Sequence, residues 1–285
     1  MWADEVIVQD CSSTDRTVEI AREYTDKVFV VPNNPTMPNV SFNKSFERAS
    51  CEWILSLSHD ERVSPELRDE INALLANQPA CTGYQMPRRN LMLGRWIQYG
   101  VFAPQMAMQL RFFRNGKGKY ACVDIHEGLT VDGTVGKLKG ELLHDHVRTA
   151  GDYLLRAIHY STNEGEMYLK KVNGHLEWSD LILVPARYFA LSFFVQRGYR
   201  DGIAGLAISL LAAMEQLAAV LRAWDLANHW AEIQQAEPDS IRFRNTVMVD
   251  LIETFGGLLR ACVGTTQPAE VIRKCLKKFT GSEDG

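Results

Sequence analysis

Short apolar runs alternate with polar turns along the first third of the chain. The runs of strand length are residues 6–8, 27–31 and 53–57. Between the first two runs, Val18, Ala21 and Tyr24 recur at helical spacing and predict a helix with one inward face. A strand, a helix and a second strand joined by a right-handed crossover form a parallel pair. The pattern therefore predicts an α/β fold.

The third run, residues 53–57, changes from apolar to acidic within two positions and leads into a helix. Ser64 is placed to cap this helix and Pro65 to occupy its first position, and the helix is expected to run to about residue 76. In open α/β sheets, ligands bind beyond the carboxyl ends of the strands. Asp60 and Glu61 lie there and could hold a metal or a sugar hydroxyl. The alternative is a solvated turn whose acids only cap the helix.

The remaining pattern predicts a mixed middle and a helical second half. A short helix is expected at residues 41–49, strands at 83–87 and 110–114, and a hairpin at 131–135, whereas 88–100 is too irregular to assign. Apolar stretches at 181–195 and 203–224 have helical spacing. These helices could lie on a bilayer interface, or cover each other or a partner subunit. We predict two regions, residues 1–150 and 151–285.

Composition narrows the class of protein. With 285 residues and 46% hydrophobic content, the chain can bury one large core or two small ones. Thirty-one basic residues against 35 acidic ones give a net charge of −4, which argues against a dedicated nucleic-acid binder. No run of eighteen uncharged apolar residues and no charged-then-apolar leader occurs. We expect a cytoplasmic protein, either free or peripherally attached to a membrane.

The cysteines are scattered and contain no CxxC pair, so they suggest neither a disulfide framework nor a zinc site. They are Cys11, Cys51, Cys81, Cys122, Cys262 and Cys275. Free thiols in a reducing compartment are the expected state.

An ordered series of blocks between about residues 2 and 224 resembles family 2 glycosyltransferases of the lipopolysaccharide-core β-glucosyltransferase type. The blocks are DEVIVQDCSSTDRTVEIA, WILSLSHDERVSPEL, GRWIQYGVFAPQMAMQLRFFRNGKGKY, DIHEGLTVDGTVGKLKGELLH and RGYRDGIAGLAISLLA. The resemblance implies the GT-A fold, a Rossmann-like and mostly parallel sheet flanked by helices, here followed by a helical C-terminal region. It also implies that the chain begins after the family's apolar first strand, which would leave a sheet edge exposed.

The resemblance further implies an inverting hexosyltransferase. The donor would be a UDP-sugar with Mg²⁺ or Mn²⁺, and the acceptor a lipopolysaccharide-core, lipid-linked or other cell-envelope glycan. Such an enzyme works in the cytoplasm or peripherally on the inner face of the cytoplasmic membrane. In this chain the helical region would contact the acceptor or the membrane.

Site residues follow from matching motif positions. Asp10 would hold the nucleotide at the end of its strand, beside Asp60 at the same rim of one parallel sheet. Asp60 matches the second acid of the family's DxD-like signature, Glu61 follows it, and Ser58 stands at the first acid. The residues expected to bind the nucleotide-sugar are Asp10, Ser12, Asp15, Lys44, Ser58, Arg111 and Arg114, and those expected to bind the metal are Asp60, Glu61 and His144.

Two of these expectations have ordinary alternatives. Arg111 and Arg114 are expected to alternate to one face of their strand and to contact phosphate or acceptor, although solvated arginines are common. His144 follows two leucines at a strand end and could help to hold the metal or the diphosphate.

An inverting transfer also needs a base that removes the acceptor proton. The pair His126-Glu127, with Asp124 nearby, stands where the family places it, and Glu127 is the expected base. The alternative is a structural pair at a strand end.

Two other functions stay open on the sequence. Ser58 and the missing first strand would also fit a catalytically degenerate relative retained for interaction. A different nucleotide-using enzyme, such as a nucleotidyltransferase, is the third hypothesis, because a strand–helix–strand unit with acids at strand ends serves many chemistries.

Overall fold

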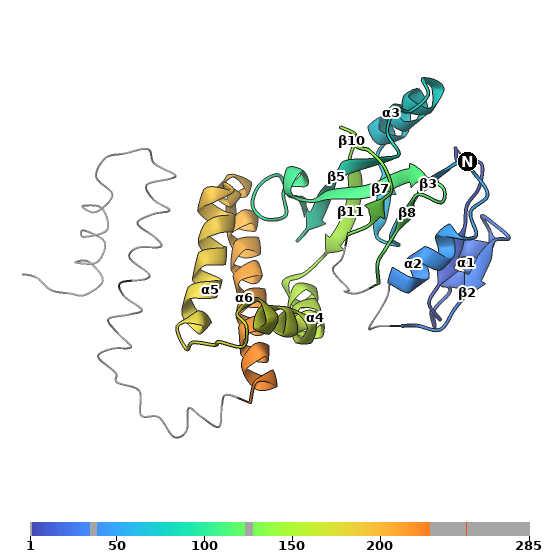
Figure 1. Ribbon diagram of the computed structural model, residues 1–285. Helices are drawn as coiled ribbons and strands as arrows, with labels where there is room; N and C mark the ends of the chain where they lie inside the picture. The colour runs from blue at the N-terminus through green and yellow to red at the C-terminus, as the bar shows by residue number, and fades with distance from the viewer. Residues whose placement is uncertain (1, 35–38, 123–127, 229–248, 250–285) are drawn as a thin grey trace, which may run out of the picture. The chain divides into compact units, whose positions relative to one another are not determined.

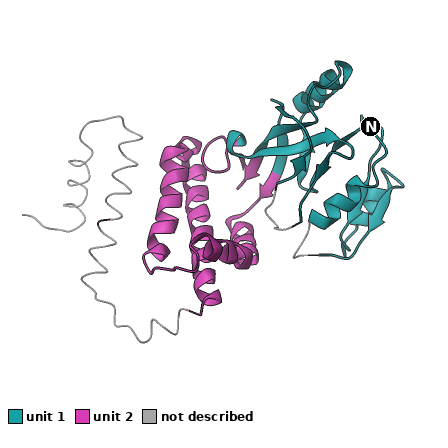
Figure 2. Cartoon of the chain, in the orientation of Figure 1, with its two compact units in different colours: residues 1–89, 104–144 teal, residues 90–103, 145–285 magenta. Residues whose placement is uncertain are grey.

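The computed structural model describes residues 2–34, 39–122, 128–228 and 249 (Figure 1). The chain divides into two compact units, which are coloured separately in Figure 2. We call Met1–Arg89 with Pro104–His144 the sheet unit, and Asn90–Ala103 with Asp145–Gly285 the helical unit. Residues 90–103 thus belong with the helices, although the sequence placed them in the first region.

A strand–helix–strand motif opens the sheet unit. Strand β1 (Val8–Asp10), helix α1 (Thr17–Arg22) and strand β2 (Val28–Val30) follow one another, and the two strands pair in parallel with Val8 opposite Val28. The predicted parallel pair is therefore confirmed. It forms a two-stranded sheet of its own, however, and not the edge of a larger parallel sheet.

The larger sheet of seven strands is mixed, so the expectation of a mostly parallel sheet is wrong. Its order is β3-β7-β5-β11-β4, with β6 and β10 pairing β5 at its side. The pairs β3–β7, β5–β7, β5–β6 and β4–β11 are antiparallel, whereas β5–β10 is parallel. Parallel neighbours usually need a helical crossover, and no α-helix lies between β5 and β11 among the described residues. The strands are β3 (Trp53–Leu55), β4 (Glu61–Val63), β5 (Gly83–Met92), β6 (Arg95–Trp96), β7 (Met108–Arg114), β10 (Val135–Lys137) and β11 (Leu142–Val147).

The predicted hairpin at residues 131–135 is also wrong. Strand β9 (Thr130–Val131) pairs with β8 (Gly118–Lys119), whereas β10 pairs with β5. The chain does turn at Asp132-Gly133, where Gly133 has a φ of 129°, but the strands on either side of the turn pair with other strands and not with each other. Strand β5 also runs through the stretch that had seemed too irregular to assign, and the short helix η1 (Pro104–Met106) precedes β7.

Helix α3 (Pro65–Ala76) has the predicted start and end. The Ser64 hydroxyl accepts the Leu67 N–H at 3.1 Å, and Pro65 occupies the first helical position. Leu67 and Ile71 of α3 are buried in a hydrophobic core. Its other members come from β5, β7, β11 and the residue after β10, and they are Tyr84, Met86, Phe112, Leu142 and Leu138. Helix α2 (Asn39–Phe46) contributes Phe46 to a second cluster with Phe113, Tyr120 and Leu129.

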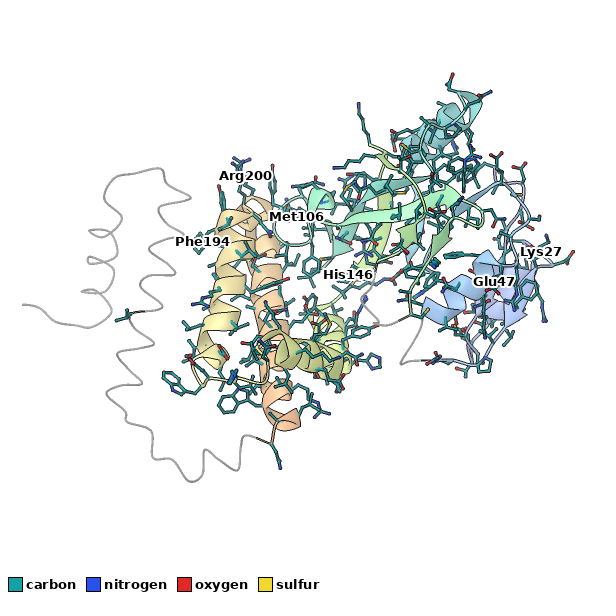
Figure 3. All side chains as sticks on the ribbon, viewed as in Figure 1. Lys27, Glu47, Met106, His146, Phe194 and Arg200 are labelled. Carbon is teal, nitrogen blue, oxygen red and sulfur yellow. The ribbon has the colours of Figure 1, made fainter. Side chains whose placement is uncertain are left out.

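The helical unit packs two helices against a third. Helices α4 (Ala150–Lys171) and α5 (Asp180–Ala190) both contact α6 (Gly202–Leu226), so the predicted apolar helices cover each other. A Cβ on Gly165 of α4 would lie 3.0 Å from the backbone nitrogen of Ala223, which shows how closely α4 approaches α6. The π-helical segment η2 (Leu191–Val195) and the 3-10 turn η3 (Gly198–Asp201) lead into α6, and Figure 3 labels Phe194 and Arg200 on them.

Helix α6, with the turn before it, is long and apolar enough to cross a membrane by length and composition. A buried helix of a soluble protein passes the same test, and α6 carries ten buried residues.

Candidate active site

A buried carboxylate, that of Glu61, lies at the centre of a polar cluster in the sheet unit. Strand β4 begins at Glu61 and pairs antiparallel with β11, which places His144 directly opposite. The Glu61 Oε1 atom lies 3.2 Å from Nη2 of Arg111 on β7 and 3.5 Å from Nη1 of Arg88 on β5. Four strands that are distant in sequence therefore meet at one acid.

The contacts of Glu61 bear on its predicted role as a metal ligand. Its Oε2 accepts the Ser58 N–H at 3.0 Å while Oε1 faces the two guanidinium groups, and its side chain has no exposed surface. Both carboxylate oxygens are thus engaged by donors of the protein. This arrangement supports a buried ion pair at Glu61 rather than an open ligand position.

Arg111 is aimed at Glu61 by an irregularity in β7. Tyr84 pairs with Phe112 and Gln85 pairs with Leu110, so Arg111 is the extra residue of a β-bulge. Bulges of this kind redirect a side chain and are common beside active sites. The Arg111 Nη1 atom also donates to the hydroxyl of Tyr120 at 2.9 Å.

Asp60, the residue before Glu61, faces a different partner. Its Oδ2 lies 3.2 Å from Nε2 of His144, whose side chain is 4% exposed against 21% for Asp60. Burial alone would raise the pKa of Asp60, but the hydrogen bond and charge of His144 and the charge of His59 outweigh it and hold the pKa at about 2. Asp60 is therefore an anion at every physiological pH, and the structure brings it together with His144 as predicted.

Asp10, Ser12 and Asp15 gather at the end of β1. The Asp10 carboxylate is buried and accepts the Ser13 N–H at 2.9 Å, and the Ser12 hydroxyl donates to the Val31 carbonyl at 2.8 Å. Asp15 is exposed, and its hydrogen bonds with Thr17 lower its pKa. Since β1 and β3 belong to separate sheets, the expectation that Asp10 and Asp60 emerge at the rim of one parallel sheet is wrong.

Arg114 has partners other than those of the cluster around Glu61. Arg114 pairs with Glu52, and its guanidinium lies 4.9 Å from the centre of the Trp53 ring. The expectation that Arg111 and Arg114 share one face of their strand is wrong, because residues three apart in a strand point to opposite sides. Lys44 is exposed on α2. The predicted catalytic residues Asp124, His126 and Glu127 lie outside the described residues.

Comparison with known proteins identifies the family. The family model described as glycosyl transferase family 2 matches residues 3–130, which include every site residue discussed so far except His144. An uncharacterised glycosyltransferase of Rickettsia conorii is 30% identical over 223 residues, which cover 74% of this chain and 77% of that protein. The chain belongs to glycosyltransferase family 2. It is thus a glycosyltransferase, as the ordered sequence blocks predicted.

The glycosyltransferase is also similar to two named proteins. A protein of Rhizobium meliloti named lipopolysaccharide core biosynthesis glycosyltransferase LpsC is 27% identical over 218 residues, which cover 74% of this chain and 78% of that protein. Among solved structures, TarS of S. aureus aligns with 79% of this chain at 12% identity and a TM-score of 0.35, and the chain spans 49% of it.

In this glycosyltransferase, helix α2 connects the end of β1 with the cluster around Glu61. The Cys11 thiol lies 3.5 Å from the Ser41 hydroxyl at the start of α2. Two residues further along, the Asn43 side chain donates to the Tyr120 carbonyl and accepts the Tyr120 N–H, both at 2.9 Å. Because Tyr120 contacts Arg111, a continuous series of polar contacts links the β1 turn to Glu61.

Two members of the site, Arg88 and Tyr120, were missed by sequence reasoning. Arg88 lies in the stretch 88–100 that the sequence pattern leaves unassigned, and Tyr120 is not among the expected site residues. The sequence does contain a signal for Arg88. The apolar positions Tyr84, Met86 and Met92 recur at even spacing, which puts Arg88 on the same face of β5 as these buried side chains. Nothing in the local sequence marks Tyr120 as the partner of an arginine.

Among the described residues, no group of three or more His, Cys, Asp or Glu side chains could hold a metal ion. Asp60 and His144 together offer one carboxylate and one imidazole. The carboxylate is the kind of ligand that a hard cation such as Mg²⁺ prefers, in a shell completed by substrate oxygens and water, whereas an imidazole is a softer ligand. Three of the described cysteines, Cys11, Cys51 and Cys81, are free thiols, as expected.

Proposed function

We propose that this family 2 glycosyltransferase moves a hexose, with inversion, from a UDP-sugar to a lipopolysaccharide-core or other cell-envelope glycan. The observation that carries the proposal is the turn Ser58–Glu61, which joins an ionised and partly exposed Asp60 to a buried anchor at Glu61 within the matched region. Similarity to the protein named for lipopolysaccharide core biosynthesis supports the class of acceptor.

The leaving diphosphate needs positive charge beside it. In this proposal Asp60 and His144 would hold Mg²⁺ or Mn²⁺, which supplies charge stabilisation to the leaving group. The protein contributes a carboxylate that stays ionised, because burial is offset by its histidine neighbours. Ser58 stands where the family signature has its first acid. Glu61 does not take over the role of that missing acid, because its carboxylate is engaged by arginines.

The nucleotide would lie beside the end of β1. The donor would be contacted there by side chains of the β1 turn and of α2, since α2 connects this turn to the cluster around Glu61. These side chains are Asp10, Ser12, Asp15 and Lys44. The proton of the acceptor hydroxyl would pass to Glu127, which His126 and Asp124 precede closely in the sequence. A place in the cytoplasm or on the inner face of its membrane belongs to the same proposal, because nucleotide sugars are made in the cytoplasm.

Calorimetry on the full chain tests the proposal. UDP-glucose, UDP-galactose and UDP-N-acetylglucosamine are titrated separately with and without Mn²⁺, and the reaction with lipopolysaccharide core is followed by the mass gained by the acceptor. We expect heat with at least one donor, dependent on Mn²⁺, and a gain of one hexose or N-acetylhexosamine. No heat with any donor and no mass gain would contradict it and favour a domain retained for interaction.

A matched pair of variants ties the result to the site. Asp60→Asn removes the charge beside His144 and is expected to abolish the Mn²⁺ dependence of donor binding. Asp69→Asn changes an exposed acid on α3 that pairs with Arg68. It is expected to bind as the wild type does, and donor binding that is unchanged in Asp60→Asn would remove Asp60 from the site.

A further inference from the structure

Two arginines share one buried acid at the centre of the cluster around Glu61. Arg88 and Arg111 both face the single carboxylate of Glu61, and the other nearby acid, Asp60, lies against His144. Burial and the charge of Arg111 lower the pKa of Arg88, while Glu61 and Asp60 act in the opposite direction. A purely structural ion pair does not need the second arginine.

The two guanidinium groups also have donors to spare. The Nε atoms of Arg88 and Arg111 are buried and have no hydrogen-bond partner among the described residues. The contact of Arg88 with Glu61, at 3.5 Å, is at the outer limit of a hydrogen bond. Buried donors in native proteins are nearly always satisfied, and an exception calls for an explanation. The protein therefore leaves part of the hydrogen-bonding capacity of both guanidinium groups unused.

The position of Arg88 suits it to contact a ligand. Its side chain is 24% exposed, against 10% for Arg111 and none for Glu61, so Arg88 lies at the outside of the cluster and Arg111 behind it. The bulge in β7 and the Tyr120 hydroxyl hold Arg111 in place. A planar guanidinium with two free N–H groups binds phosphate in a bidentate manner.

We infer that Arg88, backed by Arg111, binds a phosphate group of a substrate next to Asp60. The inference rests on the proposed function only for the origin of that phosphate. It belongs either to the diphosphate of the donor or to a phosphorylated sugar of the acceptor. The binding itself is independent of sugar transfer and can be measured without it.

Binding of inorganic phosphate and pyrophosphate to the full chain, followed by ³¹P NMR with EDTA present, tests the site apart from any metal. We expect the wild type to bind pyrophosphate and Arg88→Gln to bind it at least about tenfold more weakly, since a charge-assisted pair is lost. Arg88→Lys, which keeps the charge without the planar group, should lie between them. Arg68→Gln, at an exposed arginine on α3, should match the wild type.

Thermal unfolding of the same variants separates binding from a structural role. If Arg88 binds a ligand, Arg88→Gln keeps or raises the melting temperature, because it removes one of two like charges beside Glu61. A lowered melting temperature with unchanged pyrophosphate affinity would overturn the inference, as would a wild type that binds neither anion. Failure of sugar transfer with intact anion binding would count against the proposed function alone.

Kinetics then distinguish the two sources of phosphate. A donor origin predicts that Arg88→Gln raises the KM for the UDP-sugar with any acceptor. An acceptor origin predicts a raised KM for a phosphorylated acceptor but not for the same acceptor treated with phosphatase. If neither KM changes in Arg88→Gln, the inference is wrong.

Discussion

Replacing Glu61 by glutamine should destabilise the sheet unit strongly. Glutamine keeps an acceptor for the Ser58 N–H, so the main loss is the charge that Arg88 and Arg111 share. At an effective dielectric constant of about 20, each contact of 3.2 to 3.5 Å corresponds to roughly 5 kcal/mol of attraction, much of which offsets the cost of burying the charges. Leaving two buried cations without an anion typically costs about 3 to 5 kcal/mol, and we expect about 3.

Hydrogen exchange of peptides from β4 and β7 measures this effect locally, which matters because a chain of two units need not unfold in one step. A loss of about 3 kcal/mol corresponds to exchange that is faster by roughly a hundredfold. The double variant Glu61→Gln with Arg88→Gln should recover part of the loss, since it removes one uncompensated cation. Asp69→Asn, which breaks an exposed ion pair, should change exchange by less than about fivefold. A comparably small effect of Glu61→Gln, or simple additivity in the double variant, would refute the reasoning.

Three further perturbations test other parts of the sheet unit. Because the pKa of Asp60 lies at about 2 instead of 3.8, its ionised form adds roughly 2 kcal/mol to the free energy of unfolding above about pH 4, and this contribution is lost as the pH falls towards 2. Urea unfolding at several pH values should show the loss, and His144→Ala should abolish it. Asn43→Ala removes two hydrogen bonds to the backbone of Tyr120 and should cost about 1 to 3 kcal/mol, seen as faster exchange in β8, whereas unchanged exchange would contradict the role. A Cβ on Gly140 would lie 2.3 Å from the α3 backbone, so Gly140→Ala should lower the urea midpoint. Gly94→Ala serves as the comparison, because its added Cβ meets nothing within 4 Å and the variant measures the cost of a positive φ alone.

Local patterns predicted the elements of this fold better than their pairing. The helix from Pro65 to Ala76 followed from its cap and its first proline, and the parallel β1–β2 pair followed from the crossover rule. These features depend on residues close in sequence. The mixed sheet and the separate partners of β9 and β10 did not follow, because a strand's period gives its buried face but not its neighbour.

The same limit applied to the site. Ser58, Asp60 and Glu61 could be proposed from the sequence because one turn contains them all, and His144 because it stands at a strand end. Arg88 and Tyr120 reach the cluster only through pairing of distant strands and contacts of α2. The β-bulge that aims Arg111 has no local signature in β7, since no glycine marks it.

The two adjacent acids of the turn divide the work of the site between them. Glu61, at the start of β4, is buried against the two arginines, whereas Asp60, in the turn before β4, lies against His144. Glu61 is fully buried, and substitutions there should act mainly on stability, while Asp60 retains 21% exposure and substitutions there should act mainly on cation and donor binding. Stability and donor affinity measured side by side in Glu61→Gln and Asp60→Asn would therefore change in opposite proportions. Equal effects of both variants on both quantities would show that the turn works as one unit, and the division argued here would be wrong.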